Sequence, residues 1–451
     1  MKLGMSSNKH SIAARLDRIP WTSLHTKLLI LLSLGEFFDL YDLIAGGFTV
    51  APIHLYYHVS ISTSIFYTIA IFFLGAFIGV ILLGYIGDYL GRRTVILINM
   101  AIMSLAYLLT PFSPNIYVLG ALRFLAGFGA GPEAILVVDI MSTEFFQPSI
   151  RGNRLAIAYT IAWLAPLVVA GIAVFVLPTH WQWIFWIGGL GILSIIPLRF
   201  MIPESPRWLE VHGKYDEADK IVSKFEEQAM KEGKKLPEPI EVEVIKTKKV
   251  PLSDAFKGPY LKRMIMLIIF QFFQAAVYYG FTSLAPTVLY EKGFTFAKST
   301  TMTFVIYTGY FIGSVISIFV IEKLFDRKWQ IVTYIILAGI FGVLFGYSKS
   351  VALLETTGFL LATFLNLFSN TYHLYMAEIL PTRVRAAADG LQYSISRLGT
   401  FILLTMLGSI LVSLGPSALF LVTFVFSLIV GIDIAILGPK VTGQKVEVVA
   451  K

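Results

Sequence analysis

The chain has 451 residues, of which 56% are hydrophobic and 14% are charged, and its mean hydropathy is +0.75. This balance excludes a soluble globular protein of this size, and the absence of cysteine excludes disulfides, thiolate metal sites and thiol catalysis. The formal net charge of +8 does not indicate nucleic acid binding, because the basic residues gather in loops on one side of the predicted membrane spans.

Long apolar stretches follow a polar N-terminal segment. Residues 1–24 contain no signal-peptide cleavage site, so we expect the first span to act as the insertion signal. About 20 apolar residues cross a bilayer as a helix, and several of the later stretches are long enough to hold two spans. Two acid-containing stretches, 27–52 and 116–143, join eight apolar stretches to predict twelve transmembrane helices. The apolar stretches hold no Asp, Glu, Lys or Arg apart from Lys349: 61–87, 94–122, 155–198, 264–290, 299–321, 329–354, 356–377 and 398–432.

The distribution of lysine and arginine predicts the orientation. The loops of one side hold only Lys292, Lys298 and Lys349, whereas the termini and the loops of the other side hold most of the basic residues. Positively charged loops stay in the cytoplasm, so we expect a multi-pass plasma membrane protein with both termini cytoplasmic. The predicted parts are a cytoplasmic segment (1–24), a six-helix bundle (25–200), a cytoplasmic loop with an amphipathic helix at 216–230 (201–262), a second six-helix bundle (263–438) and a cytoplasmic tail (439–451).

The two halves repeat at an offset of about 234 residues. Distinctive residues recur, and not only apolar ones: Gly46, Ala51 and Pro52 recur as Gly280, Ala285 and Pro286, Gly75 and "FIG" as Gly309 and "FIG", and Glu144 and Arg151 as Glu378 and Arg385. Parallel repeats of six helices predict two bundles related by an axis along the membrane normal, with a solute site between them at mid-membrane.

A cytoplasmic loop between the second and third spans reads "GYIGDYLGRRTVI" (84–96). Asp88 at the end of one helix, Gly91 in the turn, and Arg92 and Arg93 at the start of the next can form a charge-assisted latch. Ordinary positive-inside anchoring is the alternative. This stretch resembles the signature loop of the major facilitator superfamily, and "RFLAGFGAG" (123–131), "EFFQPSIRG" (144–152) and "PESPRWL" (203–209) resemble its sugar-porter and organic-ion branches, including aromatic-acid and phosphate proton symporters.

The resemblance implies a major facilitator fold and a cytoplasmic gate. The gate would stabilise the outward-facing state, and it would comprise Asp88, Gly91, Arg92, Arg93, Glu144, Arg151, Glu378 and Arg385.

Three acids lie within the first span, in "GEFFDLYDL" (35–43). Charges at bilayer depth are rare and are usually functional. Counting about 1.5 Å per residue places Asp42 and Arg123 at similar depth, so that they can pair, with Asp39 one turn further in and Glu36 without an evident partner. Since an acid beside arginine loses its proton more readily than a buried acid alone, we predict that Asp42 couples transport to protons, with Asp39 and Arg123 as partners. A static salt bridge and coupling to another cation are the alternatives.

Polar residues in the second half suggest a solute site. Gln271 and Gln274 lie one turn apart in the seventh span, followed by Tyr278 and Tyr279, and amides with aromatic faces suit hydroxylated rings. The expected Gly-Ile-Asn after the glutamines is missing, which weakens a hexose assignment. Arg397 could instead neutralise a carboxylate, or it could pair with Asp389 or cap the bundle; we interpret His373 as a packed donor. The further predicted solute ligands are Asn366, Asn370 and Gln392.

These observations predict a secondary active transporter working by alternating access, in which a proton accompanies a small polar organic solute. A sugar or sugar-like solute is favoured over an organic or aromatic acid anion. No motif places a nucleophile, a base and metal ligands at one depth, so we expect no enzyme, no metal and no cofactor. A non-transporting membrane sensor is the remaining alternative. The expected partners are the solute, protons and the lipid bilayer, with no nucleic acid, and the expected state is a monomer.

Overall fold

The computed structural model describes residues 11–132, 145–146, 151–177, 180–239, 256–321, 324–379 and 382–441. Within these ranges the chain is almost entirely helical. The elements are α1 (Ile12–Arg18), α2 (Ser23–Tyr57), α3 (Ile61–Ile65), a π-helical turn (Phe66–Ala70), α4 (Ile71–Leu90), α5 (Arg92–Leu109), a 3-10 turn (Thr110–Phe112), α6 (Ile116–Ala130), α8 (Arg151–Ala162), α9 (Ala165–Val176), α10 (Gln182–Arg199), α11 (Pro206–Val211), α12 (Tyr215–Lys231), α13 (Pro259–Glu291), α14 (Phe296–Val320), α15 (Arg327–Tyr347), α16 (Val351–Ile379) and α17 (Thr382–Leu437).

The described helices account for the predicted twelve spans. Eight helical segments are long and apolar enough to cross a membrane, and one of them, residues 390–437, holds two spans because α17 bends at Gly415. The acid-bearing α2 and the shorter apolar helices α6 and α10 complete the set. The prediction of an all-α protein of two six-helix bundles is therefore confirmed.

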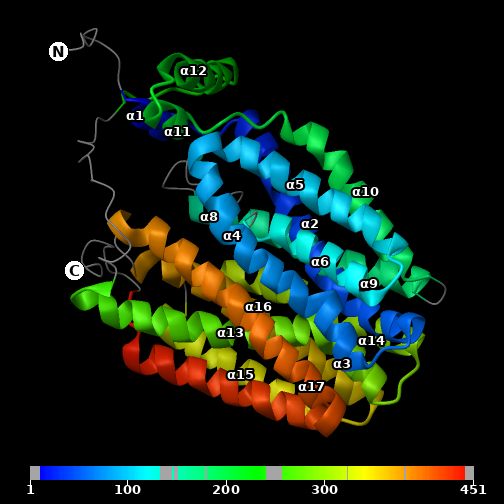
Figure 1. Ribbon diagram of the computed structural model, residues 1–451. Coiled ribbons are helices and arrows are strands. Elements are labelled where there is room, and N and C mark those ends of the chain that lie inside the picture. The colour runs from blue at the N-terminus through cyan, green and yellow to red at the C-terminus, as the bar shows by residue number, and fades with distance from the viewer. Residues whose placement is uncertain are drawn as a thin grey trace.

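The two halves form separate bundles that lie side by side. In Figure 1 α2, α5, α6 and α10 lie in the upper part of the molecule, and α13, α15, α16 and α17 lie in the lower part. Corresponding helix pairs use glycine in the same way: a Cβ at Gly75 in α4 would overlap the carbonyl oxygen of Phe124, and a Cβ at Gly309 in α14 would overlap that of Phe359. These close approaches of the backbones match the repeat seen in the sequence.

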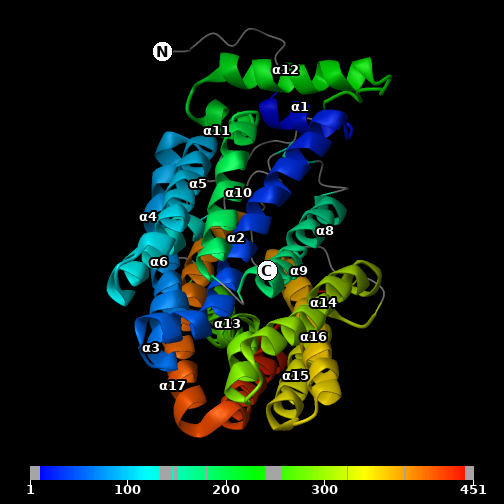
Figure 2. The same cartoon turned by 90° about the vertical axis from the view of Figure 1, so that its right-hand side faces the viewer.

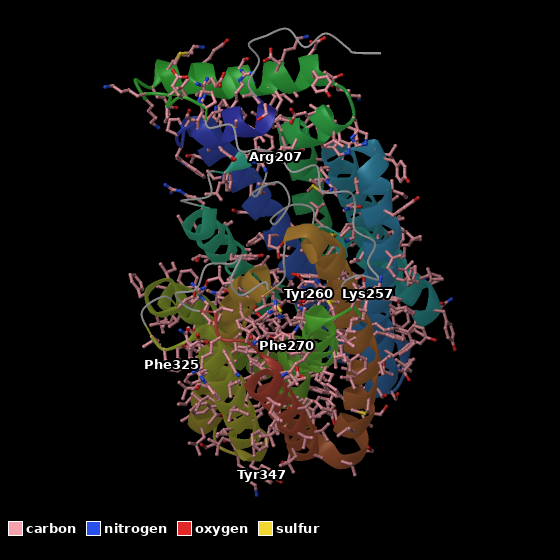
Figure 3. All side chains as sticks on the ribbon, turned by 90° about the vertical axis from the view of Figure 1, so that its left-hand side faces the viewer. Arg207, Lys257, Tyr260, Phe270, Phe325 and Tyr347 are labelled. Atoms are coloured by element: carbon pink, nitrogen blue, oxygen red, sulfur yellow. The ribbon has the colours of Figure 1, made fainter. Side chains whose placement is uncertain are left out.

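Three helices outside the bundles form a layer at one end of the molecule. Figure 2 shows α12 lying crosswise over α1 and α11, and in Figure 3 Arg207 of α11 lies near the top while Tyr347, the last residue of α15, lies at the bottom. The amphipathic helix predicted at 216–230 is confirmed as α12, which buries Ala218, Val222, Phe225 and Ala229. We call α1, α11 and α12 the end layer.

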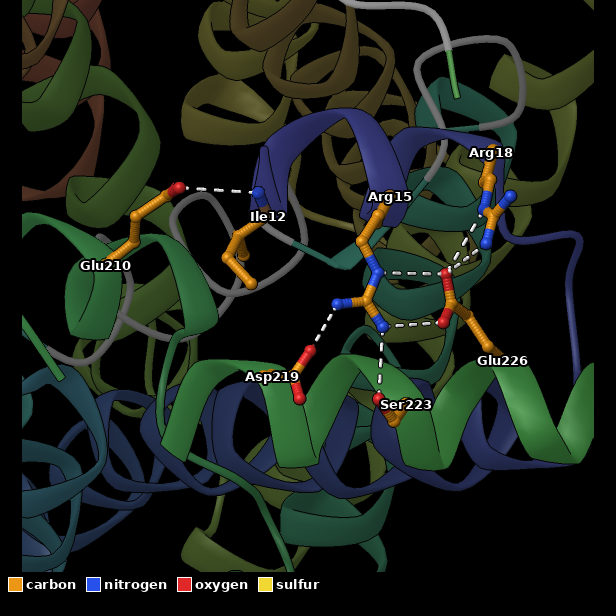
Figure 4. A network of polar contacts seen from close by, with 7 residues as sticks. All are labelled: Ile12, Arg15, Arg18, Glu210, Asp219, Ser223 and Glu226. Atoms are coloured by element: carbon orange, nitrogen blue, oxygen red, sulfur yellow. Dashed lines mark hydrogen bonds and ion pairs between the residues drawn. The ribbon is translucent and has the colours of Figure 1, made fainter. Parts of the chain in front are cut away.

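Ion pairs join α1 to α12 within the end layer (Figure 4). The carboxylate of Glu226 accepts from Arg15 Nη2 and from Arg18 Nη2, both at 2.7 Å. Arg15 also donates to Asp219 Oδ1 at 2.5 Å and to Ser223 Oγ at 3.0 Å. Since Phe225 of α12 packs edge-on against His25 at the start of α2, with ring centroids 4.8 Å apart, the layer is fastened to the N-terminal bundle.

Candidate functional site

The predicted pair of Asp42 and Arg123 is present in the N-terminal bundle. Arg123 Nη1 of α6 lies 2.5 Å from Asp42 Oδ1 of α2, and the two side chains are 1% and 0% exposed. Tyr107 of α5 donates a hydrogen bond to the same carboxylate oxygen. Three spans therefore meet at one buried charge pair.

The rest of the Arg123 guanidinium is also well enclosed. Its Nε donates to the Thr68 carbonyl at 2.9 Å, and Thr68 belongs to the π-helical turn that interrupts the second span. Such turns are frequent at functional sites because they displace carbonyls from the regular ladder. The rings of Phe72, Tyr107 and Phe185 surround the guanidinium, with centroids 5.0–5.5 Å from its central carbon. Removing one partner from such a buried pair typically costs about 3–5 kcal/mol.

A cavity lies between the two bundles, with about 690 Å³ of space that is partly open to solvent. Residues from both halves line it, as the predicted site between the repeats requires. Aromatic rings are the most frequent side chains of its walls, and aliphatic, polar and charged groups lie among them. The lining comprises Glu36, Asp39, Leu40, Leu43, Phe72, Ala76, Ala130, Gly131, Tyr159, Trp163, Gln274, Tyr278, Tyr279, Ser369, Tyr372, His373, Tyr393 and Arg397.

The three acids of α2 are divided between two environments. Glu36 and Asp39 line the cavity, whereas Asp42 does not and instead faces Tyr107 and Arg123 inside the N-terminal bundle. Residues three apart on a helix are offset by about 60° around its axis, so Glu36 and Asp42 point about 120° apart. Asp39, between them, is the cavity-lining acid nearest to the buried pair along α2.

Arg397 of α17 is the one arginine or lysine among the described residues that line the cavity. Its Nη1 donates to the Tyr279 hydroxyl at 2.8 Å, and the rings of Phe73, Tyr279 and Tyr393 lie 5.3–5.9 Å from its central carbon. Its buried Nε has no hydrogen-bond partner, and no ion pair to Arg397 occurs among the side chains that the structure describes. The arrangement leaves donors for an acceptor group of a solute.

Of the three predicted glutamine ligands, only Gln274 is among the described residues that line the cavity. Gln274 lines the cavity together with Tyr278 and Tyr279. Gln271 lies behind it: its carbonyl accepts from Gln274 Nε2 at 2.7 Å, and its own Nε2 donates to Gln392 at 3.3 Å. Gln271 and Gln392 are therefore outside the lining, where they hold Gln274 in position.

Asn366 and Asn370 also lie outside the cavity lining. Asn366 Nδ2 donates to the Tyr310 carbonyl at 2.5 Å, and Asn370 Nδ2 donates to Ser317 Oγ at 2.8 Å. Both bonds join α16 to α14, so in this conformation these amides serve helix packing rather than contact with a solute.

The predicted gate residues are only partly described. Glu144 lies outside the described residues, and the side chains of Asp88, Arg151, Glu378 and Arg385 do as well. Glu204 of the "PESPRWL" stretch accepts from the backbone N–H groups of Arg92 and Arg93 at 3.0 and 3.2 Å, and so caps the start of α5. Gly91 adopts a φ of 95° beside it, and Arg93 Nη2 donates to the Phe200 carbonyl at 2.8 Å.

Several lining residues were not among the predicted solute ligands. Tyr159 and Trp163 come from the fifth span, and Ser369, Tyr372 and His373 come from the tenth. His373 stacks on Tyr159 of the opposite bundle, with ring centroids 5.7 Å apart and an interplanar angle of 17°. Aromatic residues are common throughout this chain, so no sequence signal separates these rings from lipid-facing ones. In the described part of the chain, no three His, Asp or Glu residues are placed to hold a metal ion.

Comparisons with known proteins agree with this geometry. The family model described as "Sugar (and other) transporter" matches residues 28–451. YyaJ of Bacillus subtilis, named for metabolite transport, is 30% identical over 91% of both chains. The niacin transporter NiaP of Acinetobacter baylyi is 27% identical and covers 97% of this chain and 99% of its own.

Solved structures of the xylose transporter XylE share the fold. A partially occluded inward-open form of XylE from E. coli superimposes with a TM-score of 0.76 at 17% identity, covering 93% of this chain and 99% of XylE. A structure of XylE as a proton:xylose symporter of the major facilitator superfamily gives a TM-score of 0.70 at 19% identity, covering 94% and 98%. The chain is thus a multi-pass membrane protein that belongs to the sugar and other transporter family of the major facilitator superfamily.

Proposed function

We propose that the protein is a proton-coupled symporter of a small polar organic solute, a sugar or sugar-like compound, that works by alternating access. The observation that supports this most strongly is the buried ion pair of Asp42 and Arg123, one helical turn from the cavity-lining Asp39. An ionisable pair at this depth in a transporter family is best explained by charge movement.

Coupling follows from how the surroundings of Asp42 change. Next to Arg123 the carboxylate is stabilised as an anion, whereas separation from Arg123 in a buried site favours the protonated acid. When the bundles rock, a change in the Asp42–Arg123 contact would therefore bind or release a proton. Asp39 lies between Asp42 and the cavity and would pass the proton along α2.

The direct test replaces Asp42 with asparagine. In proteoliposomes with an imposed pH gradient, Asp42→Asn is expected to abolish proton-driven accumulation, because the side chain no longer titrates, while solute exchange continues. Asp433→Asn is the matched control, since Asp433 is also a buried acid in a span (7% exposed) but is not part of the cavity lining or of the ion pair. Wild-type accumulation by Asp42→Asn would contradict the proposal.

Arg397 favours a second candidate, an organic or aromatic acid anion. A guanidinium surrounded by aromatic rings suits a ring that bears a carboxylate, and the relative NiaP is a niacin transporter. A solute panel of aldoses and aromatic carboxylates in the same proteoliposomes decides between the two. Uptake of sugars alone would leave Arg397 without its role as an anion partner, and uptake of carboxylates alone would exclude a sugar.

We also propose an orientation in the membrane, a cytoplasmic gate and a monomeric state. The basic loops and termini support cytoplasmic ends in a plasma membrane. The end layer would lie on the cytoplasmic side, and the two bundles would comprise residues 25–200 and 263–438. The cytoplasmic gate would be formed by the predicted set: Asp88, Gly91, Arg92, Arg93, Glu144, Arg151, Glu378 and Arg385. The protein would act as a monomer that carries solute and protons without catalysing a chemical reaction.

A further inference from the structure

The cavity carries opposite charges on its two walls. Glu36 and Asp39 lie on the α2 wall, and Arg397 lies on the α17 wall. His373 is a further titratable group in the described lining, and an imidazole is mostly uncharged at neutral pH. With both acids ionised, the described lining therefore holds two negative charges and one positive charge.

Glu36 has no part in the buried ion pair, which Asp42 and Arg123 form between themselves. It is 9% exposed and lines the cavity one turn from Asp39, on the same side of α2. A carboxylate at bilayer depth is unfavourable by a few kcal/mol or more. Because Glu36 lines the cavity, its charge can act directly on a bound solute, whereas Asp42 is engaged with Arg123 outside the lining.

We infer that Glu36 is a specificity-determining residue: with Asp39 it makes the α2 wall of the cavity acidic, so that the cavity prefers neutral, hydroxylated solutes to carboxylates. This inference rests on the proposed function, since it assumes that the solute crosses the membrane through this cavity.

The chemistry of the two walls fits a polyhydroxylated ring. Carboxylates accept strong, charge-assisted hydrogen bonds from hydroxyl groups, and the guanidinium of Arg397 donates to hydroxyl oxygens on the other side. Gln274 can both donate and accept, and the rings of Trp163 and Tyr278 offer apolar faces to C–H groups. A neutral solute of this kind satisfies both walls without adding a charge.

A solute that carries a carboxylate would be attracted by one wall of the cavity and repelled by the other. Its attraction to Arg397 is opposed by two carboxylates in the same partly desolvated space, where charges interact more strongly than in water. Like charges placed together in a binding site are an effective way to reject a wrong partner. Removing one acid should therefore relax the discrimination against anions.

The test compares three pyranoses that differ in charge: glucose, glucuronate and glucosamine. Their affinities for the solubilised full chain are measured by titration calorimetry, in the wild type and in Glu36→Gln. We expect the wild type to bind glucose and glucosamine more tightly than glucuronate. In Glu36→Gln the ratio of glucose to glucuronate affinity should fall by roughly tenfold, which corresponds to about 1.4 kcal/mol.

Two further variants separate charge from structure. Glu36→Asp restores the carboxylate and should restore the wild-type ratio, and Glu355→Gln, outside the cavity lining, should leave the ratio unchanged. If Glu36→Gln does not fold, the wild-type ranking of the three sugars still decides, because an acidic wall must place glucuronate last.

Distinct results would overturn the inference and the proposed function. An unchanged ratio in Glu36→Gln, a wild type that prefers glucuronate, or no binding of any of the three sugars contradicts the assignment of Glu36. Uptake assays on the same preparations address transport separately. Binding in the expected order without any uptake would support the charge discrimination and contradict the proposed symport.

Discussion

Acids six residues apart on α2 lie in different environments. Asp42 is fully buried against Arg123 and Tyr107, whereas Glu36 borders the cavity. The 120° between them around the helix axis is enough to direct one into the N-terminal bundle and the other toward the opposite bundle. One short stretch of sequence thereby supplies the proposed proton site and the proposed solute site from different faces of the same helix.

Tyr279 accepts a hydrogen bond from Arg397 through its hydroxyl, and a substitution can test whether this bond positions the guanidinium. Tyr279→Phe removes the 2.8 Å hydrogen bond to the guanidinium but keeps the ring that lies against it. Hydrogen bonds to charged groups contribute about 1.5–3 kcal/mol. We therefore expect solute affinity to weaken by roughly tenfold, as measured by titration calorimetry with the transported solute.

The exposed Tyr347 at the far end of α15 provides the matched control, and Tyr347→Phe should bind solute normally. Tyr279→Leu, which also removes the ring, should weaken binding further than Tyr279→Phe. Unchanged affinity in Tyr279→Phe would mean that this hydroxyl does not position Arg397 for the solute.

Depth along a helix was predictable from the sequence, but the direction of a side chain was less so. Counting residues placed Asp42 level with Arg123, and the two are paired. The same counting could not show that Asn366 faces α14 while Gln274 faces the cavity, because the rotation of a span depends on its packing against neighbours. Counting along one helix could not place Glu36 either, because the cavity that it lines is formed by both bundles.

At the scale of helices, the contact between α1 and α12 depends on ionisation. Burial alone would raise the pKa of the Glu226 carboxyl, but hydrogen bonds and charges from Arg15 and Arg18 outweigh burial and hold this pKa below its ordinary value of 4.5. The ionised form therefore stabilises the contact.

This lowered pKa predicts how the contact responds to acid. A group whose pKa is depressed on folding contributes its full stability above its unfolded pKa and loses it as the pH falls through the folded value. The distance between spin labels at Ala13 and Lys224 should thus stay constant from pH 7 to pH 4.5 and lengthen only below that, where Glu226 takes up a proton.

Glu226→Gln should remove the acid dependence and show the longer distance already at neutral pH. Glu227, the exposed neighbour, is the control, and Glu227→Gln should behave as the wild type. A contact that lengthened above pH 5 in the wild type would show that another group controls it.

The elements differ in how well the sequence predicted them. The helix at 216–230 has apolar residues at helical spacing over four turns, so its pattern was clear, and α12 is found there. In contrast, α1 was expected only as part of a polar segment. Seven residues are too few for a periodic pattern, and this helix is held by the Ser11 cap and by ion pairs to a segment about 200 residues away.

At the scale of the whole molecule, the two bundles touch closely where α2 meets α13. A Cβ on Gly47 would overlap the carbonyl oxygen of Ser283, so no larger residue fits without separating the helices. Overpacking of this kind costs about 1–3 kcal/mol. Gly47→Val should therefore favour the conformation in which α2 and α13 are separated near Gly47 and Ser283, and should raise the population of that conformation roughly tenfold.

The absence of native cysteine makes this shift measurable with a single introduced thiol. Ile65→Cys is suitable, because Ile65 is fully buried against Gly408 of the other bundle. An impermeant maleimide should label it about tenfold faster when Gly47→Val is present. Gly84→Val, where a Cβ meets no atom within 4 Å, should have no effect, and equal labelling in all three proteins would rule out a gating contact at Gly47.

The two-bundle architecture was predictable because the two halves of the sequence repeat each other. Glycines and prolines repeated at one offset indicated two bundles and a site between them, and Pro52 and Pro286 occupy the corresponding helices α2 and α13. The conformation adopted by the bundles was not predictable, since both states of an alternating-access protein use the same sequence and their free energies differ by only a few kcal/mol.

The fastening of the end layer has a practical consequence. Because α12 is tied by ion pairs to α1 and by Phe225 to the start of α2, it must travel with the N-terminal bundle as one body. A fluorophore on α12 and another on α15 would then report the rocking of the two halves as a change in energy transfer, while a pair on α12 and α1 would stay silent. The layer thus lets one of the two dyes lie outside the membrane-spanning helices while it reports the motion of the N-terminal bundle.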